Sequence, residues 1–393
     1  MSAGSRRWLW ALAILAGLLY AAKSLVCGVY LVETASMEPT IQGSRPGGER
    51  VLVVYGGAPP ARFDPVVVLR EGEAVPLVKR VVGLPSERVQ IVDGDLLIDG
   101  ARLGPDAPRP AAIPVFDERW QDPSAAFPIP QAAQPFWSLA HGEWKLVARS
   151  GVRAPNRLEF FGDVKDSYLD AEHALVEGEI PVNDLALALD LLQEEPGSLA
   201  SFSLSEAGDV FDFEIARTRE GKLAARILRR GEGDDAAPEM LASAELGLHA
   251  TGWHRVRVSN IDNTLCLERD GRRVLVAQYE ENRFAREDRL QLGHSLLPRL
   301  AFGGAGGELH FRGLRIERDL YYTPRGDYAT HKAEGLGPAS YFLLGDNSSQ
   351  SRDGREWGET KARELIGRPV RVVWPLTDFR AIQGAVPPPP RLR

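Results

Sequence analysis

The sequence predicts a mostly β protein with one N-terminal transmembrane helix and a β-sandwich inserted into a second β domain. Three observations lead to this prediction. An apolar run at 8–32 has about the length of a helix that crosses a bilayer. Short apolar runs bounded by Gly, Pro or Asp, which are typical of strands, dominate the rest. The pattern of 33–112 returns in 319–383, which indicates that 113–318 is an insertion.

Composition sets broad limits on the class of protein. A length of 393 residues allows two or three domains. The formal net charge of -7 gives no support to a nucleic-acid partner, which is usually bound by a basic domain. Cys27 lies in the apolar run and Cys266 in a distant strand-like segment, so we expect neither a disulfide between them nor a cysteine-based metal site.

The N-terminal run has two interpretations. Residues 1–7 are polar and end in Arg6-Arg7, and the run itself is interrupted by Lys23, which lies close enough to the outer end to reach the headgroups. A retained anchor is the interpretation we favour; a cleaved secretory signal with a cut site near Ala21-Ala22 stays open. Arg6-Arg7 favour a cytoplasmic N-terminus, with the remaining chain outside the cytoplasm.

Strand patterns follow in the first part of the split domain. Each is rich in β-branched residues and ends at a turn signal, and Asp93-Gly94 is a preferred hairpin turn. The expected strands are 50–55, 64–69, 77–82, 89–92 and 95–98. After them, 101–135 is rich in Pro and Ala and is expected to be a long irregular connection.

The insert shows many short alternating segments, as half-solvated antiparallel strands do. The expected strands are 185–189, 210–215, 254–258, 264–268, 273–276, 299–302 and 308–316. Their spacing suggests a sandwich or jelly roll, and 252–258, the Asp270-Gly271 hairpin and 311–316 resemble laminin-G or concanavalin-like domains. Residues 259–263 could form a calcium loop, but we expect a hairpin turn. No ligand of the insert can be predicted.

The second part of the split domain has expected strands at 341–344 and 370–375. The proline-rich tail, 384–393, is expected to be disordered.

Three polar stretches carry the candidate chemistry: 34–41 around Ser36, 77–85 around Lys79, and 345–358. A serine nucleophile needs a neighbouring base. The seven histidines lie outside the three stretches, and no G-x-S-x-G elbow is present. A lysine can serve if burial holds it neutral. On a strand, Lys79 would share a face with Leu77 and Val81.

Each stretch alone also has a structural explanation. Lys79 could extend to solvent from a strand edge, Ser36 could lie in a linker turn, and 345–358 could be a polar loop between strands. In that loop, Asp346 and Asn347 could bond local backbone, and Asp353 could pair with Arg355. The joint occurrence of the three stretches in this order favours a functional site.

Together the stretches Thr34-Ala35-Ser36-Met37-Glu38-Pro39, Lys79-Arg80-Val81-Val82-Gly83-Leu84-Pro85 and Gly345-Asp346-Asn347 through Arg355 resemble the motifs of the type I signal peptidases. The resemblance implies that Ser36 is the nucleophile and Lys79 the general base. It implies that Thr34 contributes to the oxyanion hole, that Ser351 orients the lysine and that Asp353 supports it. Asp346, Asn347 and Arg355 match the closing motif.

The resemblance therefore implies a membrane-anchored serine endopeptidase that removes signal peptides from preproteins after small residues, with no metal or organic cofactor. It would be a single-pass protein of the cell (inner) membrane with its catalytic domain on the extracytoplasmic side, and the lipid bilayer would be a partner. Two alternatives stay open: a membrane-tethered binding protein on an inactive peptidase scaffold, and a self-cleaving Ser–Lys peptidase similar to the SOS repressors.

Overall fold

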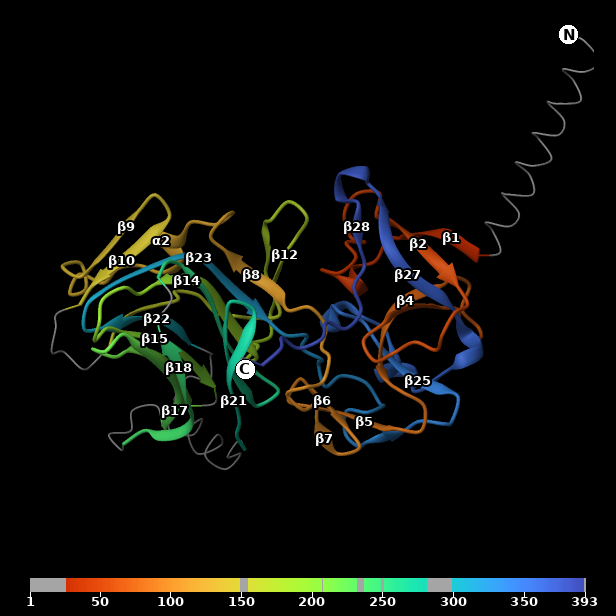
Figure 1. The fold of residues 1–393 in the computed structure, drawn as a ribbon. Coiled ribbons are helices and arrows are strands. Elements are labelled where there is room, and N and C mark those ends of the chain that lie inside the picture. The colour runs from red at the N-terminus through yellow and green to blue at the C-terminus, as the bar shows by residue number, and fades with distance from the viewer. Residues whose placement is uncertain are drawn as a thin grey trace, which may run out of the picture. The chain divides into compact units, whose positions relative to one another are not determined.

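The computed structural model describes residues 26–148, 155–206, 208–231, 237–248, 251–280 and 299–391. They form two compact units (Figure 1). Unit 1 holds the described residues up to Leu103, together with Pro108–Ala111 and Tyr322–Val386; unit 2 holds Gly104–Ala107, Ala112–Tyr321 and the residues from Pro387 onward. The prediction of a mostly β chain in which one domain is split by another is confirmed.

Unit 1 is built on an eight-stranded sheet in the order β1-β2-β27-β3-β4-β25-β26, with β28 paired to β27. A four-stranded sheet, β24-β5-β6-β7, completes it. The strands of the large sheet are β1 Cys27–Val32, β2 Glu49–Tyr55, β3 Pro65–Val68, β4 Leu77–Gly83, β25 Ser340–Leu344, β26 Thr360–Lys361, β27 Leu365–Trp374 and β28 Arg380–Ala381. Those of the small sheet are β5 Arg88–Val92, β6 Asp95–Ile98, β7 Ala101–Arg102 and β24 Glu334–Gly335.

Strand β4 is buried on both faces of this sheet. All but its first residue are buried. Val78 packs in one apolar cluster with Met37 and Ile41. Val81, two residues past Lys79 and so on the same face, packs in a second cluster with Val66. The expected alternation of faces is therefore present, and a charged side chain on either face of β4 is removed from water.

Strand β1 corrects the outer end of the predicted membrane span. Cys27–Val32 pairs antiparallel with β2 from Cys27↔Val54 to Val32↔Glu49, so these residues belong to the sheet. Their β-branched and aromatic side chains suit a strand, and the edge of β2 offers backbone partners that the sequence pattern does not show. Residues 8–25 of the predicted span lie outside the described residues. Within the described residues, no helix is long and apolar enough to cross a membrane.

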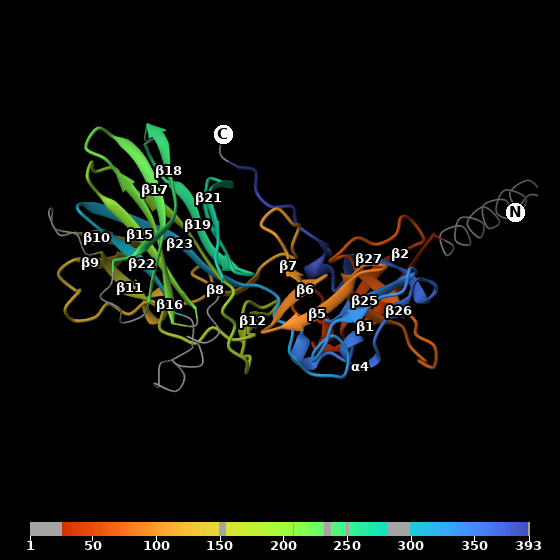
Figure 2. The ribbon, with the colours of Figure 1, turned by 90° about the horizontal axis from the view of Figure 1, so that it is seen from below.

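Unit 2 is a sandwich of two antiparallel sheets (Figures 1 and 2). One sheet has the order β21-β20-β19-β14-β23-β10-β9, with β8 paired to β23; the other is β11-β22-β15-β16-β17-β18. A third, two-stranded sheet is formed by β12 and β13. One core fills the space between the two large sheets and contains Trp144, Phe202, Phe213 and Phe311.

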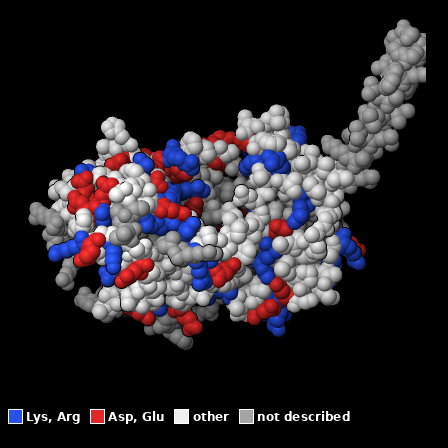
Figure 3. Space-filling model, in the orientation of Figure 1, with Lys and Arg blue, Asp and Glu red and all other residues white. Residues whose placement is uncertain are grey.

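The elements of unit 2 are β8 Ile113–Asp117, α2 Pro123–Ala126, β9 Trp137–Ala140, β10 Glu143–Val147, β11 Asn156–Glu159, β12 Tyr168–Leu169, β13 Leu175–Val176, β14 Leu185–Leu192, β15 Leu199–Glu206, β16 Asp209–Arg217, β17 Lys222–Gly231, β18 Glu239–Leu248, β19 His254–Ile261, β20 Thr264–Arg269, β21 Arg272–Gln278, β22 Leu300–Ala305 and β23 Glu308–Arg318. Charges of both signs are interspersed over unit 2 on the face drawn in Figure 3.

Two expectations about unit 2 need correction, and one is confirmed. The segment 101–135 is not wholly irregular, because Ile113–Asp117 forms β8 and pairs with β23. The tail is not wholly disordered, because the Arg273 N–H donates to the Pro390 carbonyl at 2.8 Å. Both depend on partners far away in the chain, which local composition does not reveal. Asp262 and Asn263 lie at φ 49° and 55° between β19 and β20, which confirms the hairpin turn.

Candidate active site

Ser36 and Lys79 meet in unit 1. Ser36 lies in η1 (Ala35–Met37), a single 3₁₀ turn that follows β1, and Lys79 lies in the middle of β4. The Lys79 Nζ donates a hydrogen bond to the Ser36 Oγ at 2.8 Å. Lys79 is 2% exposed and Ser36 is 7% exposed. A buried amine in direct contact with a hydroxyl is the arrangement in which a lysine can take the hydroxyl proton.

Polar anchors hold the loop that follows Ser36. The buried Glu38 carboxylate accepts hydrogen bonds from the Ser44 N–H at 2.8 Å and the Ser44 hydroxyl at 2.6 Å. Glu49, at the start of β2, accepts from the Gln42 N–H at 3.0 Å and pairs with Arg380 at 2.9 Å. These contacts bind the loop to β2 and β28, so the turn that carries Ser36 is fixed at both ends.

The environment of Lys79 lowers its pKa to about 8 from an ordinary value of 10.5. Burial is the largest cause, because a low-dielectric setting disfavours the ammonium form. The charges of Asp353 and Asp346 act in the opposite direction, and Arg355 adds a smaller lowering effect. At pH 7 a group with a pKa of about 8 is neutral in about one molecule in ten, so a usable fraction of Lys79 is free base.

Arg80 points to the opposite face of β4 and pairs with Asp346. Its Nε donates to one carboxylate oxygen at 2.6 Å and its Nη2 to the other at 2.5 Å, which is the two-point geometry that suits guanidinium and carboxylate. The Thr40 hydroxyl also donates to Asp346 at 2.5 Å. This buried group joins the loop after Ser36, β4 and the turn after β25.

Asp353 and Arg355 form a second buried pair under the site. The Asp353 carboxylate accepts from the Gly345 N–H at 3.0 Å and from Arg355 Nε at 2.9 Å and Nη2 at 2.8 Å. Arg355 also donates to the Ser348 hydroxyl at 2.5 Å and the Ser348 carbonyl at 2.8 Å. The expected ion pair is therefore present, and it fixes the polypeptide from Gly345 to α4 (Gly354–Trp357).

Gly345 packs closely against both Ser36 and Ser351. A Cβ added at Gly345 would lie 2.2 Å from the Ser351 Oγ and 2.5 Å from the Ser36 carbonyl oxygen, closer than real side chains approach. The Asn347 N–H donates to that same carbonyl at 3.2 Å. Only glycine therefore allows the turn after β25 to pack against the backbone of Ser36.

The predicted supporting residues are brought to the site to different degrees. The Thr34 and Ser36 hydroxyl oxygens are 3.3 Å apart, within hydrogen-bonding distance. Asp353 is near enough to influence Lys79. Ser351, which is expected to orient Lys79, makes no hydrogen bond to it here: among the described residues the buried Ser351 Oγ has no hydrogen-bond partner. Lys79 Nζ instead bonds to Ser36.

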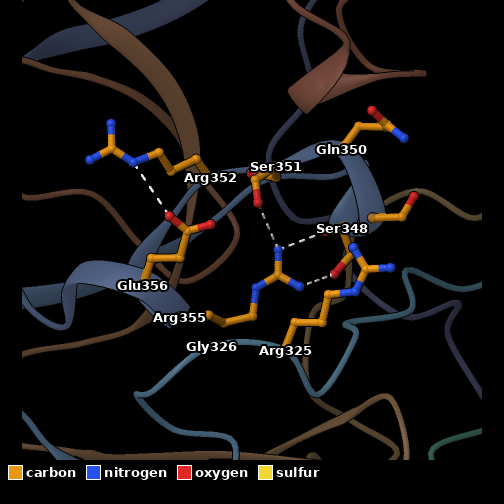
Figure 4. A pocket seen from close by; sticks show the side chains of 9 residues that line it. Arg325, Gly326, Ser348, Gln350, Ser351, Arg352, Arg355 and Glu356 are labelled. Carbon is orange, nitrogen blue, oxygen red and sulfur yellow. Dashed lines mark hydrogen bonds and ion pairs between the residues drawn. The ribbon is translucent and has the colours of Figure 1, made fainter.

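A cavity of about 290 Å³ lies beside Ser351 (Figure 4). It is lined by residues of two segments of unit 1: Arg325, Gly326, Ser348, Ser349, Gln350, Ser351, Arg352, Arg355 and Glu356. Neither Ser36 nor Lys79 lines it. Figure 4 shows the guanidinium of Arg355 between Ser348 and Ser351, and Arg352 paired with Glu356.

Sequence reasoning missed two contributors, Arg80 and Arg325. The Arg80–Asp346 pair could have been predicted, because a guanidinium in the middle of an apolar strand needs a carboxylate partner. Asp346 lies in the polar turn of the third candidate stretch. No sequence signal indicates Arg325, because it follows Pro324 in a segment without periodic pattern.

Comparison with known proteins relates both segments of unit 1 to one family. Residues 5–131 and 312–374 match the family model described as "Signal peptidase, peptidase S26". The two matched segments contain Ser36, Lys79 and Asp353, and they extend into the first and last elements of the sandwich. The chain is thus similar to this family of serine peptidases on both sides of an inserted β-sandwich.

Two curated relatives are both signal peptidase I. The protein of Bacillus caldolyticus is 30% identical over 118 residues, which cover 29% of this chain and 60% of the relative. That of Bacillus licheniformis is 34% identical over 100 residues, covering 24% of this chain and 51% of the relative. The chain thus spans between half and two thirds of the length of these relatives.

Solved structures similar to this chain include a carbohydrate-binding module, CBM66, from Bacillus subtilis and the catalytic domain of an endo-1,3-β-glucanase from Thermotoga petrophila. The TM-scores are 0.31 and 0.30, with 8% and 11% sequence identity. The similarity covers 46% and 47% of this chain and 90% and 80% of the two structures.

Proposed function

We propose that this protein is a membrane-anchored serine endopeptidase that removes signal peptides from exported preproteins with a Ser36–Lys79 pair. The observation that carries the proposal is the 2.8 Å contact between the Lys79 Nζ and the Ser36 Oγ in a buried setting. Similarity to the signal peptidase family supports the substrate class.

In the acylation step, neutral Lys79 removes the proton from the Ser36 hydroxyl while the Oγ attacks the scissile carbonyl carbon. The tetrahedral intermediate collapses, the peptide C–N bond breaks, and the Lys79 ammonium gives its proton to the leaving amine. Water then attacks the ester carbonyl with Lys79 again as base. The ester bond to Ser36 breaks, the hydroxyl regains a proton, and the acyl group leaves as a carboxylate.

The negative charge that develops on the carbonyl oxygen needs donors placed in advance. The Thr34 hydroxyl is the candidate, since it lies 3.3 Å from the nucleophilic oxygen, and the Ser36 N–H is the second donor we propose. Ser351 and Asp353 would support Lys79: Asp353 through its charge, and Ser351 by turning its unpartnered hydroxyl toward the ammonium when substrate binds.

An exposed apolar face supports placement of unit 1 at a bilayer. Val29 and Leu31 of β1 are 52% and 47% exposed, and Trp374 of β27 is 47% exposed. The pairing of β1, β2 and β27 places Arg50 between Leu31 and Trp374. The side chains of Leu31 and Trp374 therefore lie on one outer face of the sheet. Leu376 and Phe379 follow β27 and are 71% and 55% exposed. We define these five residues as the outer apolar face, and contiguous exposed patches of this kind mark interaction sites.

Cleavage of a preprotein by detergent-solubilised protein tests the proposal. Wild type should cut after a small residue, and Ser36→Ala and Lys79→Ala should lose at least about a thousandfold in kcat/KM, since both act in one unit. Circular dichroism should show that both variants are folded. If wild type cuts none of several preproteins, or if Ser36→Ala retains activity, the peptidase proposal is wrong and a binding function on an inactive scaffold takes its place.

A further inference from the structure

The cavity beside Ser351 carries a positive charge that its own neighbours do not balance. Three guanidinium groups line it, against one carboxylate, Glu356. Arg355 is matched by Asp353 at 2.8 Å. Arg352 is shared between Glu73 at 3.0 Å and Glu356 at 3.3 Å. Arg325 is exposed, and within the described part of the chain it has neither an ion pair nor a hydrogen bond.

A neutral donor adds to the lining. Gln350 contributes a side-chain amide to the same cavity, and Figure 4 shows it on the opposite side of Arg355 from Glu356. The Ser349 hydroxyl, also at the cavity, donates to the Asn347 side-chain oxygen at 3.2 Å. Guanidinium groups with additional hydrogen-bond donors are the chemistry that recognises carboxylate or phosphate oxygens. A volume of about 290 Å³ accommodates a carboxylate side chain together with several waters, since a water takes about 30 Å³ of liquid.

The cavity adjoins the nucleophile through Ser351 and Gly345. Ser351 lines the cavity. Its Oγ and the Ser36 carbonyl oxygen lie on the same side of Gly345, 2.2 and 2.5 Å from the point where a Cβ would stand. An extended peptide advances about 3.3 Å per residue. A substrate whose scissile bond lies at Ser36 therefore has side chains that can reach the cavity within a few residues of the cut.

From this geometry we infer that the cavity is a substrate subsite in which Arg325 and Arg352 bind an aspartate or glutamate side chain on the leaving-group side of the scissile bond. The inference rests on the peptidase function proposed above. The leaving-group side is assigned because the acyl side of a signal-peptide substrate continues from an apolar segment, whereas the leaving side is the polar start of the mature protein.

Paired peptides test the subsite. Each pair shares one cut site and differs only by Glu or Gln at one of the first four positions after the cut. At one of these positions wild type should cleave the Glu peptide about fivefold faster in kcat/KM, the size expected for partly exposed charge pairs. Arg325→Gln should abolish that preference while the Gln peptide is cleaved at the wild-type rate. The preference should also shrink at high salt.

Arg363→Gln is the matched control, because Arg363 is exposed (79%) in the same unit and lies outside the cavity; it should keep the full preference. If the Gln peptides are cut in a Ser36-dependent manner and no position favours Glu, or if Arg325→Gln retains the preference, the subsite is wrong and the peptidase function stands. If neither member of any pair is cut, both proposals are wrong. Cleavage of the Gln peptide and the thermal midpoint of Arg325→Gln show whether that variant is folded.

Discussion

Burial and nearby carboxylates act in opposite directions on the pKa of Lys79. Its position on a strand buried on both faces disfavours the ammonium form, and the same burial supplies the free base that the proposed mechanism requires. The carboxylates of Asp353 and Asp346 limit the effect and keep the pKa at about 8. The residue is thus basic enough to take a proton from Ser36 and neutral often enough to do so.

The pH dependence of cleavage follows from this pKa. Because only neutral Lys79 acts as the base, kcat/KM should rise about tenfold per pH unit below about pH 8 and level off above it. Initial rates on a soluble peptide substrate, measured from about pH 5 to 10 at constant ionic strength, check the prediction. A flat profile over this range would contradict the assignment of Lys79 as base.

Replacing Lys79 by Met should stabilise the fold while abolishing activity. Below about pH 8 the lysine is protonated in both the folded and unfolded states, and wild type bears the full desolvation penalty, about 3 kcal/mol for a shift from 10.5 to about 8. Between about pH 8 and 10.5 the folded state has released this proton and the unfolded state retains it, so the wild-type penalty fades.

Urea unfolding of wild type and Lys79→Met at pH 7 and pH 10 measures the difference. The variant should be more stable by about 3 kcal/mol at pH 7, and by much less at pH 10. A variant that is less stable than wild type at pH 7 would show that the lysine stabilises the native state as a cation.

At the residue scale the sequence predicted the Ser36–Lys79 pair and the Asp353–Arg355 pair. The Ser36–Lys79 pair could be predicted only from the joint occurrence of the three stretches, because each stretch alone also has a structural explanation. The role of Ser351 in orienting Lys79 stays a prediction, because hydroxyl direction depends on packing around Gly345, which spacing along the chain cannot show. The place of Arg325 at the cavity could not be predicted, because the segment that carries it has no periodic pattern.

At the element scale, β4 directs two cations to opposite faces, where each meets a different partner. Lys79 reaches η1, and Arg80 reaches the turn after β25. The Arg80 and Asp346 side chains are 3% and 0% exposed. Desolvation makes such a pair a weak source of net stability, yet removal of one partner leaves a buried charge unmatched.

Asp346→Asn should therefore destabilise the protein by about 3–5 kcal/mol, because Arg80 loses its countercharge. The double variant Arg80→Met/Asp346→Asn should recover most of this loss, since neither charge then remains. Chemical denaturation with both variants and the Arg80→Met single variant forms the cycle. If the double variant is no more stable than Asp346→Asn, the loss does not come from an unmatched charge.

Elements with strong β-branched patterns and turn dipeptides were predicted well. The hairpin of β5 and β6 turns at Asp93-Gly94, with both residues at positive φ. The end of the membrane span was misplaced because β1 continues the apolar run without a break in composition. Strand β8 lies in a Pro-rich segment and is defined by its pairing with β23, a contact made far away in the sequence.

At the scale of the whole molecule, each unit has its own apolar core, and unit 1 also presents the outer apolar face. Introducing charge there should weaken action at a bilayer without harming the site. We expect Leu376→Asp/Phe379→Asp to reduce cleavage of a vesicle-embedded preprotein several-fold and to leave cleavage of a short soluble peptide unchanged.

Val75→Asp is the control for this pair, because Val75 is 61% exposed in the same unit and is not part of the outer apolar face. It should leave both rates unchanged. Equal loss on the vesicle-embedded and soluble substrates in the double variant would argue for damage to the fold, and no loss on either would argue that this face does not meet lipid.

Because unit 2 is inserted into unit 1, the two parts of unit 1 are synthesised at different times. Arg80 and its partner Asp346 are 266 residues apart. At about 5–20 residues per second of synthesis, roughly 13–50 s pass before Arg80 can find its countercharge. Through that interval the nascent chain carries the nucleophile and its base without the segment that buries them, whereas the sandwich strands have nearly all emerged. We expect the nascent protein to have no peptidase activity until the segment that contains Asp346 has been synthesised. This delay would protect the ribosome-bound chain from its own active site.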